Sequence, residues 1–242
     1  MNPATSAEAR RIAARTRRAV AGLARTDVVA CPPFVYLPIV SSRRPALNFS
    51  LGAQSVSDKE SRAYTGHVSA DMLKDLGVEY VIAGHSEQRN LGDTDAVVAG
   101  RIMRIVEVGL KAVVCVGENT RDDNGAYLAG LKEQLKNSLL GLPRERAKNI
   151  IIAYEPVWAV GASQAMAPEQ IYEMSIFIKK VFADIFGLEP AMKAKVLYGG
   201  SVNSRNAADI ISIGKVDGLL VGRESVNLPG FVELLRAVDK ID

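Results

Sequence analysis

The amino-acid sequence predicts an α/β fold, a (β/α)8 barrel whose first β-strand is missing from the chain. Short apolar runs recur along the 242 residues, and their starts lie roughly 20 to 45 residues apart, as in consecutive βα units. These runs are nearly continuous in Val, Ile, Ala and Leu, which is typical of parallel strands that are buried on both faces. No linker rich in Ser, Gly or Pro divides the chain, so we expect residues 1–242 to form a single domain.

Seven of the apolar runs are expected to be strands, and a helix precedes the first of them. The strands are expected at residues 27–31, 48–53, 80–83, 111–116, 150–154, 195–198 and 218–221. The first helix is expected over residues 6–24, since Thr5 and Glu8 have the spacing of a capping box. Thr94 and Pro168 are typical of the starts of two later helices. In a complete barrel each helix follows its own strand, so either the sheet is open or a strand that belongs before the first helix is missing.

Composition and charge exclude several classes of function. The net charge of +3 is too small and too evenly spread for a nucleic-acid-binding protein, although it suits a small anionic substrate. The two cysteines, Cys31 and Cys115, cannot form a disulfide framework, so a cytoplasmic location is expected. No apolar run reaches the roughly 18 residues of a membrane span, and arginines between residues 10 and 18 interrupt any signal peptide. No cluster has the spacing of metal ligands and no nucleotide fingerprint is present, so we expect neither a metal nor a cofactor.

Two strand ends carry candidate catalytic groups. Glu155 lies between the apolar strand 150–154 and the segment Pro-Val-Trp, where partial desolvation would raise its pKa toward the range of a general base. The segment 156–167 is long and rich in small residues, which predicts a mobile lid. His85 follows strand 80–83, and such a histidine is more often a structural residue than a catalytic one. Taken generically, Glu87 and Arg89 would be an ion pair on the surface.

The last two strands end in glycine-containing turns that could hold a phosphate. Strand 195–198 is followed by Gly-Gly and Ser201, and strand 218–221 is followed by Gly222 and Arg223. Glycines let backbone N–H groups approach an anion, and the loops after the last two strands of such barrels often bind phosphate. A Gly-Gly pair alone is weak evidence, because turns need glycine. Together with a lid and a carboxylate at a third strand end, these turns predict proton transfer beside the carbonyl of a small phosphorylated molecule.

Four ordered blocks of the sequence resemble the triosephosphate isomerase family. They are GHSEQR at 84–89, AYEPVWAVG at 153–161, YGGSV at 198–202 and DGLLVG at 217–222. The block around Tyr-Glu-Pro-Val-Trp is highly specific, and the similarity extends from Met1 to the C-terminal helix. The resemblance implies an eight-stranded barrel that interconverts glyceraldehyde 3-phosphate and dihydroxyacetone phosphate without a cofactor.

The resemblance also implies roles for individual residues. Glu155 would move the proton between C1 and C2, neutral His85 would polarise the carbonyl, and Glu87 would support the site from the same loop. Tyr198 would hold the closed lid. The phosphate would be held, largely by backbone N–H groups, at Gly161, Ser201, Gly222 and Arg223.

A homodimer is implied by the same resemblance. Thr65 and Gly66 resemble the loop tip that a neighbouring subunit receives. His67 and Gln88 stand where the family usually has Glu and Arg, which pair across the interface. A hydrogen bond between the two could replace that ion pair, or each residue could have drifted independently.

The sequence departs from the family pattern at three places. Arg223 stands where Gly is common, and residues 162–164 differ from the usual lid sequence. The family's first strand ends in Asn-x-Lys, and Met1-Asn2 match the two residues after that lysine. We therefore expect the natural protein to begin about one strand upstream, and we expect a chain that starts at Met1 to have little activity.

Two rival functions remain open on the sequence. The first is a catalytically impaired barrel that still binds phosphate but lacks the active-site lysine. The second is another phosphosugar isomerase or epimerase on the same fold, although the block around Glu155 argues against it.

Overall fold

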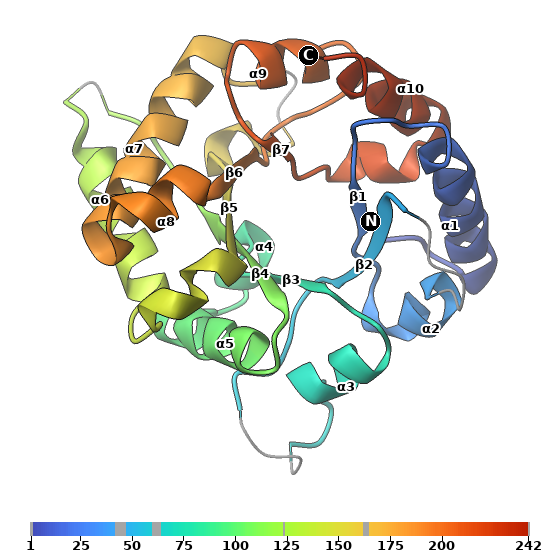
Figure 1. Cartoon of the computed structure of the whole chain (residues 1–242), viewed down its shortest axis with the longest axis horizontal. Coiled ribbons are helices and arrows are strands. Elements are labelled where there is room, and N and C mark those ends of the chain that lie inside the picture. Colours follow the sequence, from blue (N-terminus) through green and yellow to red (C-terminus); the bar gives the residue numbers. More distant parts are fainter. Residues whose placement is uncertain (1, 42–46, 60–63, 123, 162–164, 242) are drawn as a thin grey trace.

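The computed structural model describes residues 2–41, 47–59, 64–122, 124–161 and 165–241. Within them, seven parallel strands form one sheet in the order of the sequence. The strands are β1 (Val28–Ala30), β2 (Phe49–Ala53), β3 (Tyr80–Ala83), β4 (Lys111–Val116), β5 (Ile150–Tyr154), β6 (Lys195–Tyr198) and β7 (Gly218–Leu219). The sheet curls around a central axis with the helices outside it (Figure 1), which confirms the predicted barrel architecture.

The helices lie between the strands along the chain, as expected. They are α1 (Ser6–Val20), α2 (Leu37–Val40), α3 (Ala70–Asp75), α4 (Ser86–Asn90), α5 (Asp95–Glu107), α6 (Ala126–Ser138), α7 (Pro168–Phe186), α8 (Leu188–Lys193), α9 (Ala207–Ser212) and α10 (Leu228–Val238). Short 3-10 helices are η1 (Phe34–Tyr36), η2 (Arg144–Asn149), η3 (Val157–Ala159) and η4 (Arg223–Val226). Thr5 and Thr94 accept backbone N–H groups at the starts of α1 and α5, and Pro168 opens α7, so all three predicted helix starts are confirmed.

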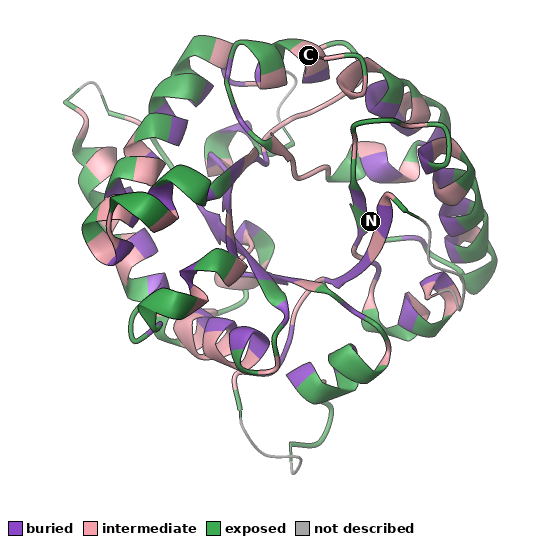
Figure 2. Ribbon diagram, in the orientation of Figure 1, coloured by how far each residue is buried: buried purple, intermediate pink, exposed green. Residues whose placement is uncertain are grey.

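Alternating side chains of the strands build two apolar layers. Ala112, Val114 and Val116 of β4 point outward and join the large core between the sheet and the helices. Val113 and Cys115 point inward and pack inside the barrel. Figure 2 shows the central strands as largely buried, whereas β7 is intermediate throughout. Burial of β4 and β5 fixes their register, and with it the position of the residue that follows the last pair.

The two ends of the sheet face each other under a pair of packed helices. Among the described residues, β1 pairs only with β2, and β7 pairs only with β6. On the outside, α1 packs against α10 (Figure 1). Asp239, directly after α10, accepts the backbone N–H groups of Ala24 at 3.0 Å, Arg25 at 2.8 Å and Thr26 at 2.9 Å. The helical ring is therefore tied together across the interval between β7 and β1.

Three strands are shorter than the sequence predicted, β2 by a single residue, and the first helix ends at Val20 rather than at residue 24. β7 covers only Gly218–Leu219, although the apolar run extends to Val221. Leu220 still donates its N–H to the carbonyl of Tyr198, but β7 has a strand neighbour on one side only among the described residues, so no second ladder extends it. β1 is likewise confined to Val28–Ala30. The expectation of a strand before Met1 concerns residues outside this chain and stays a prediction.

Candidate active site

The carboxyl ends of the parallel strands bring the predicted catalytic residues to one mouth of the barrel. His85 follows β3 by two residues, and Glu155 follows β5 directly. Although 70 positions separate them in the sequence, His85 Nε2 lies 3.1 Å from Glu155 Oε1. The juxtaposition of an imidazole and a carboxylate, predicted from two separate strand ends, is thus present in the structure.

Glu155 is a buried carboxylate with few compensating contacts. Its side chain is only 3% exposed. Its Oε2 accepts the backbone N–H of Ser86 at 3.3 Å, and the Cys115 thiol donates a hydrogen bond to the carboxylate. Burial raises the pKa of Glu155, and this effect outweighs the lowering by His85, Ser86 and Cys115. A carboxylate with a raised pKa is a stronger base than one in water, which is the property the sequence analysis expected here.

The geometry around His85 fixes which of its nitrogens carries the proton. His85 occupies the N-cap position of α4, and its Nδ1 accepts the backbone N–H of Glu87 at 3.2 Å. An imidazole nitrogen that accepts a hydrogen bond has no proton of its own, so the proton of the neutral ring lies on Nε2. Nε2 is the atom that faces Glu155. The backbone of α4 therefore presents His85 as a neutral hydrogen-bond donor to the site.

Glycines on two neighbouring loops make room for Glu155. A side chain at Gly199, directly after β6, would place its Cβ 2.7 Å from Cγ of Glu155. A side chain at Gly117, directly after β4, would overlap the backbone carbonyl of Glu155. The first glycine of the Gly-Gly turn thus makes room for the Glu155 carboxylate, whereas the sequence indicated only phosphate binding for this turn.

Glu87 contacts the site through its backbone more closely than through its carboxylate. Its N–H binds His85 as described, whereas its side chain is 78% exposed and Oε2 lies 3.9 Å from Nδ1. The predicted support from this loop is therefore provided by the peptide group.

The prediction that Glu87 and Arg89 form an ion pair on the surface is wrong, because Arg89 has other partners. Its guanidinium turns under the loop, where it donates to the Gly84 carbonyl at 2.8 Å, to Asp95 at 2.6 Å and to Ser138 at 3.0 Å. These bonds join the start of α4 to α5 and α6. Arg89 thus fixes the loop that carries His85 by joining it to α5 and α6.

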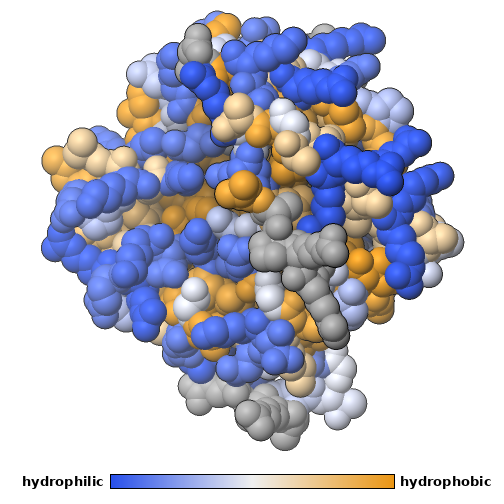
Figure 3. Space-filling model, turned by 45° about the vertical axis from the view of Figure 1, so that its right-hand side comes forward, coloured by the Kyte–Doolittle hydropathy of each residue, from blue (hydrophilic) through white to orange (hydrophobic). Residues whose placement is uncertain are grey.

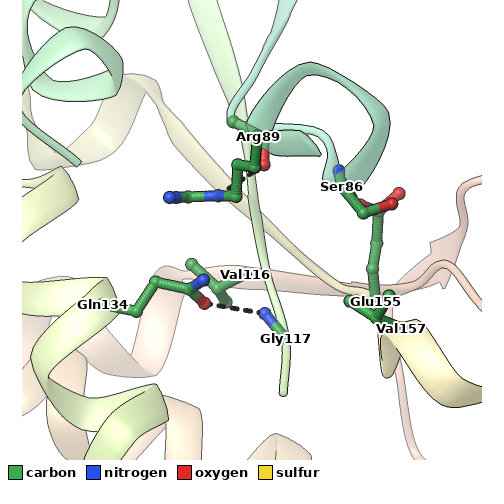
Figure 4. Close-up of a pocket in the computed structure, with 8 residues that line it drawn as sticks. Ser86, Arg89, Val116, Gly117, Gln134, Glu155 and Val157 are labelled. Atoms are coloured by element: carbon green, nitrogen blue, oxygen red, sulfur yellow. Dashed lines mark hydrogen bonds between the residues drawn. The ribbon is translucent and has the colours of Figure 1, made fainter. Parts of the chain in front are cut away.

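A small cavity lies behind Glu155, on the side of Arg89. Its volume is about 10 Å³, which is room for about one water molecule. In Figure 4 Glu155 reaches toward Ser86, while Arg89 and Gln134 line the opposite side and Gln134 accepts the N–H of Gly117 at 2.8 Å. This cavity is too small for a substrate, and the larger adjoining space of about 260 Å³, which shares Ser86, Arg89 and Gln134 with it, is not lined by Glu155.

The stem of the segment predicted to be a lid is held by a cluster of polar side chains. Glu118 is almost fully buried, and its Oε1 accepts hydrogen bonds from Tyr154 at 2.8 Å, Arg121 at 2.8 Å and the Trp158 indole at 3.0 Å. At the far stem, the N–H of Met166 donates to the Tyr198 hydroxyl at 3.1 Å. Residues 162–164 lie outside the described residues. Both ends of this segment are thus fastened, the second by Tyr198, whose role in holding a closed lid stays a prediction.

Sequence reasoning missed Glu118 and Arg121. Glu118 follows β4 by two residues, so its position at a strand end was a usable signal. Its partners come from β5, from η3 and from the loop after β4, and only the fold brings them together. The Arg121 guanidinium also lies 5.5 Å above the Trp158 ring and 4.8 Å from that of Tyr127.

Replacing Glu118 with Gln tests this cluster directly. We expect the variant to lose roughly 1–3 kcal/mol of unfolding free energy, because Arg121 would face an uncharged partner in a buried network. Trp158 is the single tryptophan of the chain, so its fluorescence reports this cluster alone. An unshifted emission maximum together with an unchanged denaturation midpoint would contradict the role given to Glu118. Glu173→Gln, on the exposed face of α7, serves as the matched control.

The predicted phosphate residues come from three adjacent loops. Gly161 belongs to the loop after β5, Ser201 to the loop after β6, and Gly222 and Arg223 to the loop after β7. The Arg223 guanidinium reaches the carbonyl of Gly161 at 2.6 Å, which joins the first and third of these loops. Their roles in binding remain predictions.

Outside this site we searched the described residues for a membrane span and for a metal site. None of the helices in the described ranges is long and apolar enough to cross a membrane. Those same ranges hold no group of three or more His, Cys, Asp or Glu side chains that could bind a metal. Much of the surface in Figure 3 is hydrophilic.

Comparisons with known proteins agree with the resemblance seen in the sequence. The family model described as triosephosphate isomerase matches residues 1–238. The triosephosphate isomerase of Thermus thermophilus is 40% identical over 234 residues, which cover 96% of this chain and 93% of the relative. That of Symbiobacterium thermophilum is 38% identical over 235 residues, covering 96% and 92%. That of Acetivibrio thermocellus is 39% identical over 215 residues, covering 88% and 86%.

Proposed function

Because the chain belongs to the triosephosphate isomerase family, we propose that it interconverts D-glyceraldehyde 3-phosphate and dihydroxyacetone phosphate by proton transfer through an enediolate. The observation that carries the proposal is the 3.1 Å distance between Oε1 of the buried Glu155 carboxylate and Nε2 of His85. A base beside a neutral hydrogen-bond donor is the pair that this reaction needs.

The proposed chemistry uses both groups in turn. The Glu155 carboxylate takes a proton from the carbon next to the substrate carbonyl, while His85 Nε2–H donates a hydrogen bond to the carbonyl oxygen that becomes negative. Glu155 then returns its proton to the neighbouring carbon, the hydroxyl proton of the second oxygen passes to the first oxygen through His85 Nε2, and the second oxygen becomes the new carbonyl. Bound substrate would replace the direct contact between Glu155 and His85, with its carbon on the carboxylate side and its oxygen on the imidazole side.

Phosphate binding would hold the substrate in this orientation. We assign the phosphate to the backbone N–H groups near Gly161, Ser201, Gly222 and Arg223, with Glu87 supporting His85 from the catalytic loop. Backbone donors at strand ends can approach an anion closely where glycines leave space. The natural setting of the proposed reaction would be glycolysis and gluconeogenesis in the cytoplasm.

We also propose that the protein acts as a homodimer. Tyr64, Thr65, Gly66 and His67 are all exposed, and the loop that carries them projects from the barrel in Figure 1. An exposed, projecting loop tip is suited to insertion into a second subunit. Sedimentation equilibrium over a range of protein concentrations would measure the association, and a monomer at every concentration would contradict it.

A direct assay tests the proposed reaction. We expect the protein to exchange the transferred hydrogen with solvent in D2O while it converts glyceraldehyde 3-phosphate to dihydroxyacetone phosphate, because the proton held by the Glu155 carboxyl group can exchange with solvent before it returns to carbon. Proton NMR would follow both processes in one sample. Phosphate-analogue binding without any conversion or exchange would favour the rival function, a phosphate-binding barrel with impaired catalysis.

A further inference from the structure

The side chain of Arg223 links two loops at the mouth of the barrel. Arg223 begins η4, directly after Gly222, and its Nη2 donates to the carbonyl oxygen of Gly161 at 2.6 Å. Sixty-two positions separate the two residues in the sequence. The bond is short because the donor is charged, and it joins the loop after β7 to the loop that begins at Glu155.

Gly161 is adapted to this contact in two ways. Its φ angle of +72° lies in the left-handed region, which favours glycine. A Cβ at this position would lie 2.5 Å from Nη2 of Arg223, so any side chain would displace the guanidinium. The close approach of Arg223 therefore depends on glycine at this point of the loop.

The charge of Arg223 is not neutralised by a carboxylate within the described parts of the chain. Its neighbour Glu224 instead accepts a hydrogen bond from Asn227 Nδ2 at 3.0 Å. Arg223 is exposed, and its contact in the described residues is to an uncharged carbonyl. An unneutralised guanidinium at the mouth of the barrel attracts anions to this place.

We propose that the Arg223 guanidinium is a side-chain ligand of the substrate phosphate, held in position by its bond to Gly161. This inference rests on the proposed function, which assigns the phosphate to the backbone of the same loops. A guanidinium carries five N–H donors in a planar fork, so a bond from Nη2 to Gly161 leaves donors for two phosphate oxygens. Arg223 thus determines specificity for a phosphorylated substrate over its uncharged analogue.

Binding of inorganic phosphate tests the proposal without catalysis. Arg223→Met keeps the length of the apolar stem and removes the charge, and Arg223→Lys keeps the charge and removes the fork. We expect Arg223→Met to weaken phosphate binding roughly tenfold or more in isothermal titration calorimetry, equivalent to about 1.4 kcal/mol, and Arg223→Lys to lie between it and the parent protein. Arg236→Met, on the exposed face of α10, is the matched control and should bind phosphate as the parent does.

Steady-state kinetics then separate phosphate binding from a purely structural role. We expect Arg223→Met to lower kcat/KM for glyceraldehyde 3-phosphate about tenfold more than kcat/KM for unphosphorylated D-glyceraldehyde, mainly through KM. Equal losses for the two substrates, or unchanged phosphate affinity in Arg223→Met, would overturn the inference.

The failure of the inference can be told apart from failure of the proposed function. If the parent protein binds phosphate through Arg223 but converts neither substrate, the proposed function fails and the inference stands. If the parent converts glyceraldehyde 3-phosphate and Arg223→Met does so equally well, the inference fails and the proposed function stands. A parent protein that binds no phosphate in the calorimeter contradicts the inference.

Discussion

Replacing Glu155 with Gln is expected to lower kcat by about 10³-fold or more and, at neutral pH, to raise the stability of the protein. The loss of activity follows because an amide cannot accept the proton from the substrate carbon, and general bases contribute typically 10²–10⁴-fold. The gain in stability follows because Gln removes the cost of holding an ionised carboxylate at a site that is 3% exposed. Few substitutions change activity and stability in opposite directions, so this pair of effects is diagnostic of the site.

The pH dependence of the stability difference has a definite sign. The pKa of Glu155 in the folded protein is raised by burial above its ordinary value of 4.5. Below that value both the folded and unfolded forms are protonated, and the parent protein carries no cost of ionisation. As the pH rises from the unfolded pKa through the raised folded pKa, the folded parent loses stability, whereas the Gln variant does not. We therefore expect the advantage of Glu155→Gln to be absent near pH 4 and to grow above it.

Denaturant unfolding at several pH values, with the proposed assay alongside, would measure both effects. Glu173→Gln changes the same functional group at an exposed position of α7 and should shift neither quantity. A Glu155→Gln protein with ordinary turnover would remove Glu155 from the catalytic role. A stability difference that is independent of pH would show that the carboxylate is not ionised in a poorly solvated site.

The elements that the sequence predicted well are those governed by local pattern. All seven strands were expected within two residues of either observed end, because apolar runs of this length can be buried on both faces in few other ways. The positions of His85 and Glu155 followed from the same reasoning, since a residue after a parallel strand must lie at the carboxyl edge of the sheet. The direct contact of the two residues needed the curvature of the sheet, which no local pattern specifies.

The features that the sequence did not predict depend on partners far away in the chain. Arg89 was interpreted with its neighbour Glu87, but its guanidinium finds Asp95 and Ser138 under the loop. Glu118 accepts hydrogen bonds from side chains of β5 and η3. The hydrogen bond from Arg223 to Gly161 joins loops that are two βα units apart in the sequence. The tertiary structure determines which residues form hydrogen bonds of this kind. The sequence alone therefore identifies the charged residue but does not predict its partner.

The largest gain in activity is expected from adding a strand that ends in Asn-x-Lys directly before Met1. In a polypeptide of residues 1–242, Lys74 lies in α3 and Lys111 begins β4, whereas Lys59 lies six residues after β2 and pairs with Asp58 at 2.7 Å. A preorganised charged donor aimed at the developing oxyanion is typically worth about 10²–10³-fold in rate. We therefore expect the extended polypeptide to turn over at least about 10²-fold faster than residues 1–242 alone.

The structure offers a place for such a strand. Asn2 Oδ1 accepts a hydrogen bond from Gln54 Nε2 at 3.3 Å, and Gln54 directly follows β2, so Asn2 lies at the mouth of the barrel. A preceding strand could pair with β1 and β7, each of which has one strand neighbour in the described residues. Pairing would remove two exposed sheet edges, so we expect higher stability as well as higher activity.

A matched extension separates the lysine from the strand. The same extension with Lys replaced by Met should restore stability without restoring turnover, because it supplies backbone pairing and no ammonium group. Both polypeptides and residues 1–242 would be compared by the isomerase assay and by thermal unfolding. Equal turnover of the Lys and Met extensions would show that the charge is not needed, and full turnover of residues 1–242 alone would show that Glu155 and His85 suffice without the added strand.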